Sequence, residues 1–354
     1  MDGFVCVRVV QMHGADLELF QFQRQLTWAA VFLNADGTIY GRYGSRSERR
    51  GMKDNDKDIS LEGFKKALEG ALELHKGFPA NKAALAGKRG PAPLAKTVEK
   101  LPAAPPEEAK PARAGDHGCI HCHQVQDWEA LSVWKSGKPV PDKLLWPYPM
   151  PDALGLTLDI RERATVSSVA EGSPAARAGF QAGDRIVALD GQPVISIADV
   201  QWVLHQAPEP FTLKCEVDRG GRKVSVELAL SEGWRRKGNF ASSLSLGWTL
   251  RMQLAGMKCD ALSPDEKKRL GLGEDALAFR IGEITPEYVK RRNNSARKLG
   301  LKKGDVITEV DGRTSSMTET ELLAYLAQQK KPGEKLSLTY LRGGESRQVE
   351  LDLP

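Results

Sequence analysis

The sequence has no apolar run near the ~20 residues that a membrane-spanning helix needs. Its best apolar run, residues 28–33, has the length of a strand. We therefore predict no membrane-spanning segment. An excess of one charge is also missing, because 51 basic residues face 46 acidic ones and the net charge is +5. This balance gives no argument for nucleic acid, and we predict no nucleic-acid partner.

Cysteine is scarce. Of the 5 cysteines, only Cys119 and Cys122 lie close together, and such an odd, sparse set argues against a disulfide framework. None is needed, since a chain of 354 residues is long enough to bury cores in roughly two to three domains.

The first residues, MDGFVCVRVVQ, show no basic start, apolar stretch or cleavage site of a secretory signal. We predict a cytoplasmic protein if Met1 is the true start. If the true N-terminus lies upstream, we predict a periplasmic or cell-envelope protein.

Residues 1–78 have the pattern of a small α/β domain. We predict strands over 4–10, 28–33 and 38–43, a helix over 16–26, a hairpin turn at 34–37 and a helix capped by Ser60. This order, with the segment TWAAVFLNADGTIYGRYG, resembles the C-terminal two-thirds of a thioredoxin-like domain. The family's C-x-x-C would precede the strand of Cys6, and Thr27 stands where the family has a cis-proline. The resemblance therefore implies an N-terminally incomplete domain without its active site.

Two segments without repeats follow. Residues 79–115 are rich in proline, alanine and charge, and we predict an extended, semi-rigid linker. Residues 116–150 begin with DHGCIHCHQVQDW and are predicted to form a short helix over 119–134 and then a Pro-rich stretch.

Residues 152–231 and 262–354 form an internal repeat, joined by a connector over 232–261. The first copy contains GSPAARAGFQAGDRIVALDGQPV and the second NNSARKLGLKKGDVITEVDGRTS. In each, a helix follows, over 197–205 and 318–329, and then two strands joined by a Gly-Gly turn. The shared pattern resembles bacterial PDZ domains of the kind appended to periplasmic HtrA-type proteases. No G-x-S-x-G motif or His/Asp/Ser set stands out, and no catalytic residue is predicted.

The PDZ resemblance implies binding of protein or peptide C-termini by strand addition beside a Gly loop. The implied binding residues are Leu154, Gly155 and Leu156 with Val200, Val203 and Leu204 in the first copy, and Leu270, Gly271 and Leu272 in the second.

Cys119, Cys122 and His123 form a C-x-x-C-H motif. Two thiols one helical turn apart can add to the vinyl groups of a haem, with His123 as the iron ligand, so we predict a c-type haem. Three alternatives remain open. Cys119 and Cys122 could bind zinc or copper with two of His117, His121 and His123, they could form a dithiol redox pair, or they could bind no ligand.

These features predict a multidomain chain of mixed α/β and α+β class. It resembles planctomycete-type thioredoxin-like/PDZ proteins, some of them selenoproteins. This resemblance implies that a UGA codon upstream of Met1 is misread as a stop, so that the missing active site would lie before Met1. The predicted function is a cell-envelope redox or electron-transfer adaptor with haem c, docked to partners by its PDZ domains. The alternatives are a non-enzymatic PDZ scaffold with a structural Cys/His metal site and a thiol-disulfide oxidoreductase.

Overall fold

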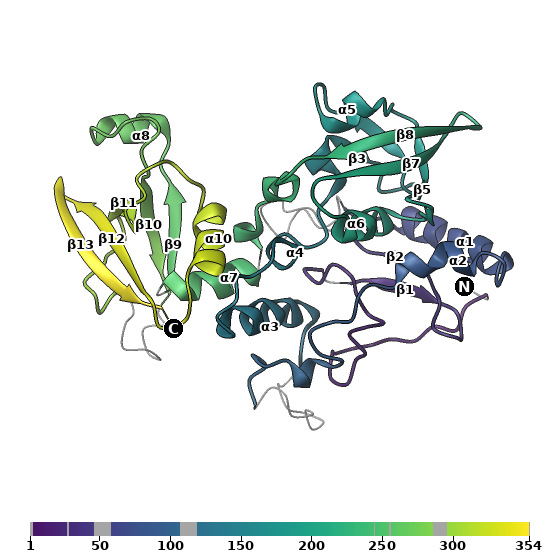
Figure 1. The fold of residues 1–354 in the computed structure, drawn as a ribbon, viewed down its shortest axis with the longest axis horizontal. Helices are drawn as coiled ribbons and strands as arrows, with labels where there is room; N and C mark the ends of the chain where they lie inside the picture. Colours follow the sequence, from purple (N-terminus) through teal and green to yellow (C-terminus); the bar gives the residue numbers. More distant parts are fainter. Residues whose placement is uncertain are drawn as a thin grey trace. The chain divides into compact units, whose positions relative to one another are not determined.

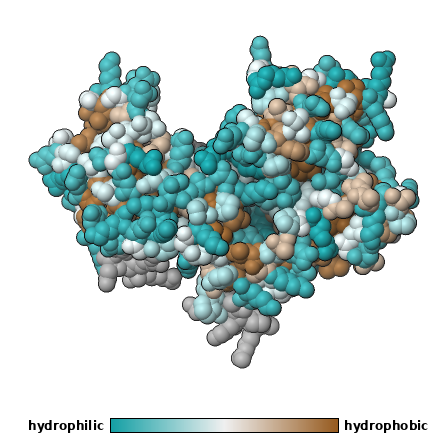
Figure 2. All heavy atoms as spheres, viewed as in Figure 1, coloured by the Kyte–Doolittle hydropathy of each residue, from teal (hydrophilic) through white to brown (hydrophobic). Residues whose placement is uncertain are grey.

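The computed structural model describes residues 3–26, 28–45, 58–106, 119–243, 245–254, 256–285 and 296–353. The chain divides into two compact units, one of residues 1–129 with 142–239 and one of residues 130–141 with 240–354 (Figure 1). In the described ranges, no helix has the length and apolar character to cross a bilayer. The face drawn in Figure 2 is mostly hydrophilic, with apolar residues in small groups.

The first unit begins with an N-terminal region, residues 3–106. Strands β1 (Ala30–Leu33) and β2 (Ile39–Tyr43) form an antiparallel hairpin, and helix α1 (Leu61–Lys76) lies against it. The Ser60 side chain accepts a hydrogen bond from the Gly63 N–H and so caps α1. The predicted hairpin and capped helix are confirmed.

Two other predictions for this region are wrong. No strand or helix is assigned to residues 3–26, where a strand over 4–10 and a helix over 16–26 were expected. In the described chain, β1 and β2 pair only with each other. The segment around Val5 and Val7 therefore has no neighbouring strand, and these side chains are 95% and 82% exposed.

The predicted extended linker is packed where the structure describes it. Residues 79–106 hold helix α2 (Lys82–Leu85) and the 3-10 turns η2 (Ala86–Lys88) and η3 (Val98–Lys100). Leu85, Val98 and Leu101 are buried, and Leu85 packs in a cluster with Phe32 and Tyr40. Residues 107–115 lie outside the described part.

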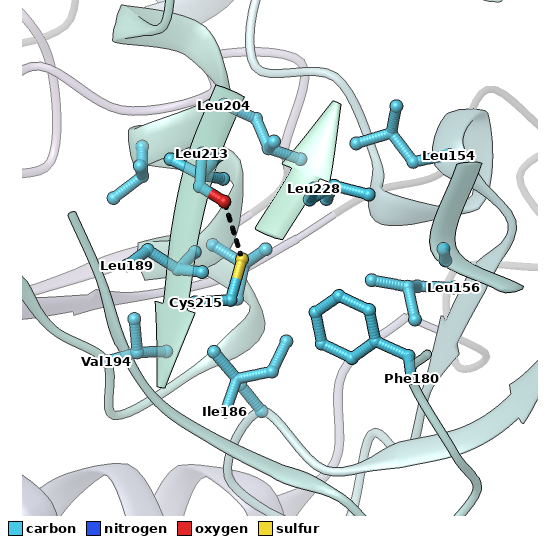
Figure 3. Packing of buried hydrophobic residues seen from close by; sticks show 14 of the residues in the cluster. Leu154, Leu156, Phe180, Ile186, Leu189, Val194, Leu204, Leu213, Cys215 and Leu228 are labelled. Carbon is cyan, nitrogen blue, oxygen red and sulfur yellow. Dashed lines mark hydrogen bonds between the residues drawn. The ribbon is translucent and has the colours of Figure 1, made fainter. Parts of the chain in front are cut away.

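The first repeat copy completes this unit. It contains 3-10 turn η4 (Pro151–Leu154), strands β3 (Leu156–Leu158), β4 (Val166–Val169), β5 (Arg185–Leu189), β6 (Gln192–Pro193), β7 (Phe211–Arg219) and β8 (Arg222–Leu230), and helices α5 (Pro174–Ala178) and α6 (Ile197–Gln206). β3 pairs with β4, and the other strands form a sheet in the order β6-β5-β7-β8. Their apolar side chains meet in one core (Figure 3). Helix α4 (Asp142–Leu145) precedes the copy and turn η5 (Trp234–Lys237) follows it.

The second unit contains the other copy. It consists of η6 (Phe240–Ser242), α7 (Leu246–Arg251), η7 (Met252–Leu254), β9 (Met257–Ala261), α8 (Pro264–Arg269), β10 (Phe279–Ile284), β11 (Val306–Val310), α10 (Glu319–Gln329), β12 (Lys335–Arg342) and β13 (Glu345–Asp352). The sheet order is β13-β12-β11-β10-β9, so β9 lies at an edge. Helix α3 (Cys122–Lys135) contains the boundary between the units. Because β9 belongs to this sheet, the second copy begins before residue 262.

Helix α6 joins the N-terminal region to the first copy. Lys88 Nζ lies 2.9 Å from Asp199 Oδ2, and each of these side chains is only 1% exposed. The other carboxylate oxygen of Asp199 accepts the Arg42 N–H at 3.1 Å. The Arg42 guanidinium lies 3.7 Å over the Trp202 ring, whose Nε1–H donates to the Gly87 carbonyl. Burial lowers the pKa of Lys88, while Asp199 favours its charged form.

Residues just before the first copy contact the other end of α6. The Tyr148 N–H donates to Nδ1 of His205 at 3.3 Å, and Gln201 Nε2 donates to the Tyr148 carbonyl at 2.8 Å. The Tyr148 and His205 rings stack with centroids 4.1 Å apart. Burial, with the nearby cations Arg235 and Lys143 adding to it, lowers the pKa of His205 to about 3, so its imidazole is neutral.

We predict that Lys88→Met destabilises the first unit by about 3–5 kcal/mol, because it leaves the Asp199 carboxylate buried without its cation. Urea unfolding of the full chain measures this. Lys88→Met combined with Asp199→Asn loses less than the two single changes together. A loss below about 0.5 kcal/mol in Lys88→Met, as at an ordinary surface site, contradicts the prediction.

We predict that His205 makes stability pH-dependent. The pKa of His205 is lower folded than unfolded, so its stabilising effect is complete above pH ~6.5 and is lost as pH falls toward about 3. His205→Gln does not titrate, so its deficit in unfolding free energy relative to wild type shrinks on acidification. Urea titrations of both proteins from pH 7.5 to 4 measure the difference, in which shared carboxylate effects cancel. A constant difference contradicts the prediction.

Candidate functional site

The Gly loop predicted for the first copy lies at the start of β3. Turn η4 ends at Gly155, which has φ +87°, and Leu156 opens the strand. A Cβ on Gly155 would lie 2.2 Å from the Ser173 Cβ, so only glycine fits. The Gly155 carbonyl accepts the Ala170 N–H at 2.8 Å.

The apolar residues predicted for this copy lie in one cluster. Leu154 and Leu156 from the loop meet Val200, Val203 and Leu204 from α6, and each is at most 5% exposed. Figure 3 shows Leu154, Leu156 and Leu204 among the core side chains. The structure thus brings these residues together, and their role in binding stays a prediction.

The chain's own N-terminal region contacts both walls beside this cluster. On the α6 side, Asp199 and Trp202 are covered by Lys88 and Arg42, as described above. Beyond β3, the Ser60 hydroxyl donates to the Ile160 carbonyl at 2.8 Å. Strand β2 lies against α6 (Figure 1), and the N-cap of α1 contacts the chain that leaves β3.

In the second copy, the equivalent loop precedes β9. Turn η7 leads to Gly256, which has φ +78°, and Met257 then opens β9. The Gly256 carbonyl accepts the Thr285 N–H at 3.0 Å, as the Gly155 carbonyl accepts that of Ala170. The structural counterpart of residues 154–156 is therefore found at Leu254, Gly256 and Met257.

Leu270, Gly271 and Leu272, the residues predicted for this loop, lie elsewhere. They follow helix α8, and Leu270 is 43% exposed. No strand begins there. The sequence does indicate the observed position of the loop, because LAGM at residues 254–257 leads directly into a run in which apolar and polar residues alternate.

Sequence reasoning also missed Glu319 and Arg251. Glu319 opens helix α10, which lies beside the edge strand β9 (Figure 1). Its carboxylate accepts the Cys259 N–H at 3.0 Å and pairs with Arg251 at 2.6 Å. No local sequence pattern connects these residues.

A cavity of about 580 Å³ is lined in part by the Gly155 loop. Ser173, Arg177, Arg235 and Lys237 are among its lining residues, but no residue of α6 is. Arg235 already pairs with Glu209 and donates to the Ala207 carbonyl. The cavity is therefore distinct from the space between α6 and β3.

The two thiols of the C-x-x-C-H motif have different surroundings. Cys119 is exposed, whereas the Cys122 thiol donates to the Arg24 carbonyl at 3.3 Å and burial raises its pKa. Burial and His121 lower the pKa of His123, and these two rings stack 5.6 Å apart. The thiols fit a haem only if Cys122 leaves this carbonyl.

For the described residues, no group of three His, Cys, Asp or Glu side chains is placed to hold a metal ion. His117 lies outside them. The haem, zinc and copper predictions are not tested by this arrangement.

Comparison with known families finds two matches to PDZ domain models, at residues 165–217 and 285–353. The chain is 27% identical over 191 residues to a probable periplasmic serine endoprotease DegP-like of Pseudomonas fulva, covering 54% of this chain and 37% of that protein. It is 29% identical over 196 residues to the periplasmic pH-dependent serine endoprotease DegQ of Escherichia coli, covering 55% and 37%. The chain thus spans under two-fifths of the length of these relatives.

Among solved structures, the HtrA3 PDZ domain bound to the phage-derived ligand FGRWV is 31% identical, with a TM-score of 0.17. The matched region covers 20% of this chain and 65% of the HtrA3 chain.

These relatives correct the predicted function. They are serine endoproteases, so the prediction of a haem redox adaptor, with its thiol-oxidoreductase alternative, is wrong. The comparisons give no support to the thioredoxin-like and selenoprotein resemblance. The chain contains two PDZ domains and is similar over about half its length to HtrA-type periplasmic serine endoproteases. PDZ1 here denotes the first repeat copy with β3–β8, matched at residues 165–217, and PDZ2 the second copy with β9–β13, matched at residues 285–353.

Proposed function

We propose that this chain is a peptide-recognition protein in which PDZ2 binds extended protein termini. The observation that carries the proposal is the position of β9, an edge strand that begins at the Gly256 turn and lies beside α10. An edge strand presents unpaired backbone groups to which an extended peptide can add as a further strand. Backbone N–H groups at the start of β9 would receive the peptide's carboxylate.

PDZ1 has a different role in this proposal. Its helix α6 is buried along residues 197–204, and polar members such as Asp199 face the N-terminal region. A peptide entering beside α6 would have to compete with a buried ion pair, which is costly to break. PDZ1 therefore serves to dock the N-terminal region, and PDZ2 is left to bind external chains.

The similarity to periplasmic endoproteases supports a link to proteolysis in the cell envelope. In that role, PDZ2 would hold exposed ends of damaged or cleaved proteins for a serine endoprotease. PDZ domains bind peptide ligands, and the partner class proposed for this chain is an unfolded protein terminus.

We predict that the peptide FGRWV binds the full chain and that amidating its C-terminus weakens binding about tenfold, since a charge-assisted hydrogen bond is lost. Isothermal titration calorimetry measures both affinities. Gly256→Ala weakens binding of the free-acid peptide, because Gly256 has φ +78°, a conformation that strains a residue with a Cβ.

Gly273→Ala is the matched control, since Gly273 lies in the same unit with no atom within 4 Å of an added Cβ. Equal affinities for the acid and amide peptides, or equal loss in both variants, contradict the proposed site.

The cofactor remains a separate prediction. We propose that Cys119 and Cys122 accept a haem when their S–H groups add across its two vinyl groups, with His123 beside the iron. Protein exported with cytochrome c maturation factors is expected to give a c-type pyridine haemochrome spectrum that is lost in Cys122→Ala. The exposed Cys6 provides the control variant Cys6→Ala, which keeps the spectrum. A colourless wild-type protein contradicts this prediction, and metal analysis of the same sample then tests zinc and copper.

A further inference from the structure

The edge of PDZ2 that the proposed function assigns to a peptide carries an internal contact. Cys259 lies in the middle of β9, and its N–H donates to Glu319 Oε1 at 3.0 Å. This N–H is directed to the side of β9 away from β10, because its acceptor is a side chain of α10 and not a strand carbonyl. A peptide strand pairing with β9 would need the same N–H.

Glu319 is held in this position by Arg251. Arg251 Nε lies 2.8 Å from Oε1 of Glu319, and Nη2 lies 2.6 Å from Oε2. The ion pair is partly shielded from water, since the Arg251 and Glu319 side chains are 16% and 15% exposed. A two-point pair of this kind fixes the carboxylate's direction as well as its charge.

The connector before β9 fixes Arg251 in turn. Arg251 ends helix α7, and its Nη2 also donates to the Ala241 carbonyl at 2.6 Å. Helix α7 packs closely on this turn, because a Cβ on Gly247 would lie 2.4 Å from the Ala241 carbonyl oxygen. Leu246 and Leu250 anchor the helix and are at most 2% exposed. Arg251 therefore lies on a rigid support.

We propose that Arg251 and Glu319 form a latch that closes the peptide site of PDZ2. The inference rests on the proposed function and adds the residues that limit its affinity. With the latch closed, Glu319 occupies the Cys259 N–H, and an incoming strand must first displace the carboxylate. Only the fraction of molecules with the latch open binds peptide, so the observed affinity is reduced by that fraction.

The test uses the full chain and the FGRWV peptide. Glu319→Ala removes the competing carboxylate and is expected to raise the affinity about tenfold, the equilibrium effect of one charge-assisted hydrogen bond. Arg251→Lys keeps the positive charge but loses the two-point contact, and a smaller gain is expected. Glu350→Ala removes an exposed PDZ2 carboxylate on β13, the opposite edge strand, and should leave the affinity unchanged.

Hydrogen exchange without peptide supplies a second measurement. The Cys259 amide is expected to exchange faster in Glu319→Ala than in wild type or Glu350→Ala, while core amides of β11 keep their protection and show that the fold is intact.

The outcomes separate the latch from the proposed function. If wild type binds peptide and Glu319→Ala binds no better, or binds worse, the latch is overturned while PDZ2 remains a peptide site. If neither wild type nor Glu319→Ala binds, the proposed function fails and the latch fails with it.

Discussion

The buried carboxylate of Asp199 determines how the first unit is built. It lies on a helix that is otherwise mostly apolar, and removing it from water is costly without a cation and hydrogen bonds. Lys88 supplies the cation, and the Arg42 and Ile195 N–H groups supply hydrogen bonds. The Lys88 and Arg42 contacts require the N-terminal region to remain on α6. Because this carboxylate is buried and needs a cation and hydrogen bonds there, it joins two parts of the chain that are far apart in the sequence.

The two PDZ domains share one framework and use it differently. In both, a 3-10 turn, a glycine with positive φ and a strand follow one another. The glycine carbonyl accepts a hydrogen bond from the N–H of the residue that directly follows the next strand, Ala170 in PDZ1 and Thr285 in PDZ2. PDZ1 has its helix covered by another region of the chain. In PDZ2, the chain also packs on α10, through η6, α7 and residues 134–140, and the Glu319 carboxylate contacts the edge strand β9. The difference lies in the polar contact at each site. In PDZ2 one carboxylate occupies the Cys259 N–H of the edge strand, whereas in PDZ1 a buried ion pair holds the N-terminal region on α6.

Some of this organisation could be read from the sequence. Both PDZ domains could be predicted from the repeated G-D pattern, the Asp-Gly turns and the Gly-Gly hairpins, because each of these features depends on local backbone requirements. The Ser60 cap and the 34–37 turn are local in the same way. Asp199 and Lys88 are separated by 111 positions, and no local pattern predicts that they meet.

The second Gly loop shows another limit. Both LAGM and LGL in this copy place a glycine between apolar residues, and only the strand that starts at Met257 distinguishes them. The C-x-x-C-H motif had a strong chemical meaning but was short, and it led the functional prediction away from the repeat that the relatives share.

Photo-cross-linking tests the central claim, that PDZ2 and not PDZ1 takes the external peptide. A photoreactive FGRWV derivative is bound to the full chain, irradiated and mapped by mass spectrometry. The account predicts adducts within residues 254–261 and 319–329. Adducts within residues 154–158 and 197–206 would contradict it, because they would show that a peptide reaches the helix that the N-terminal region covers.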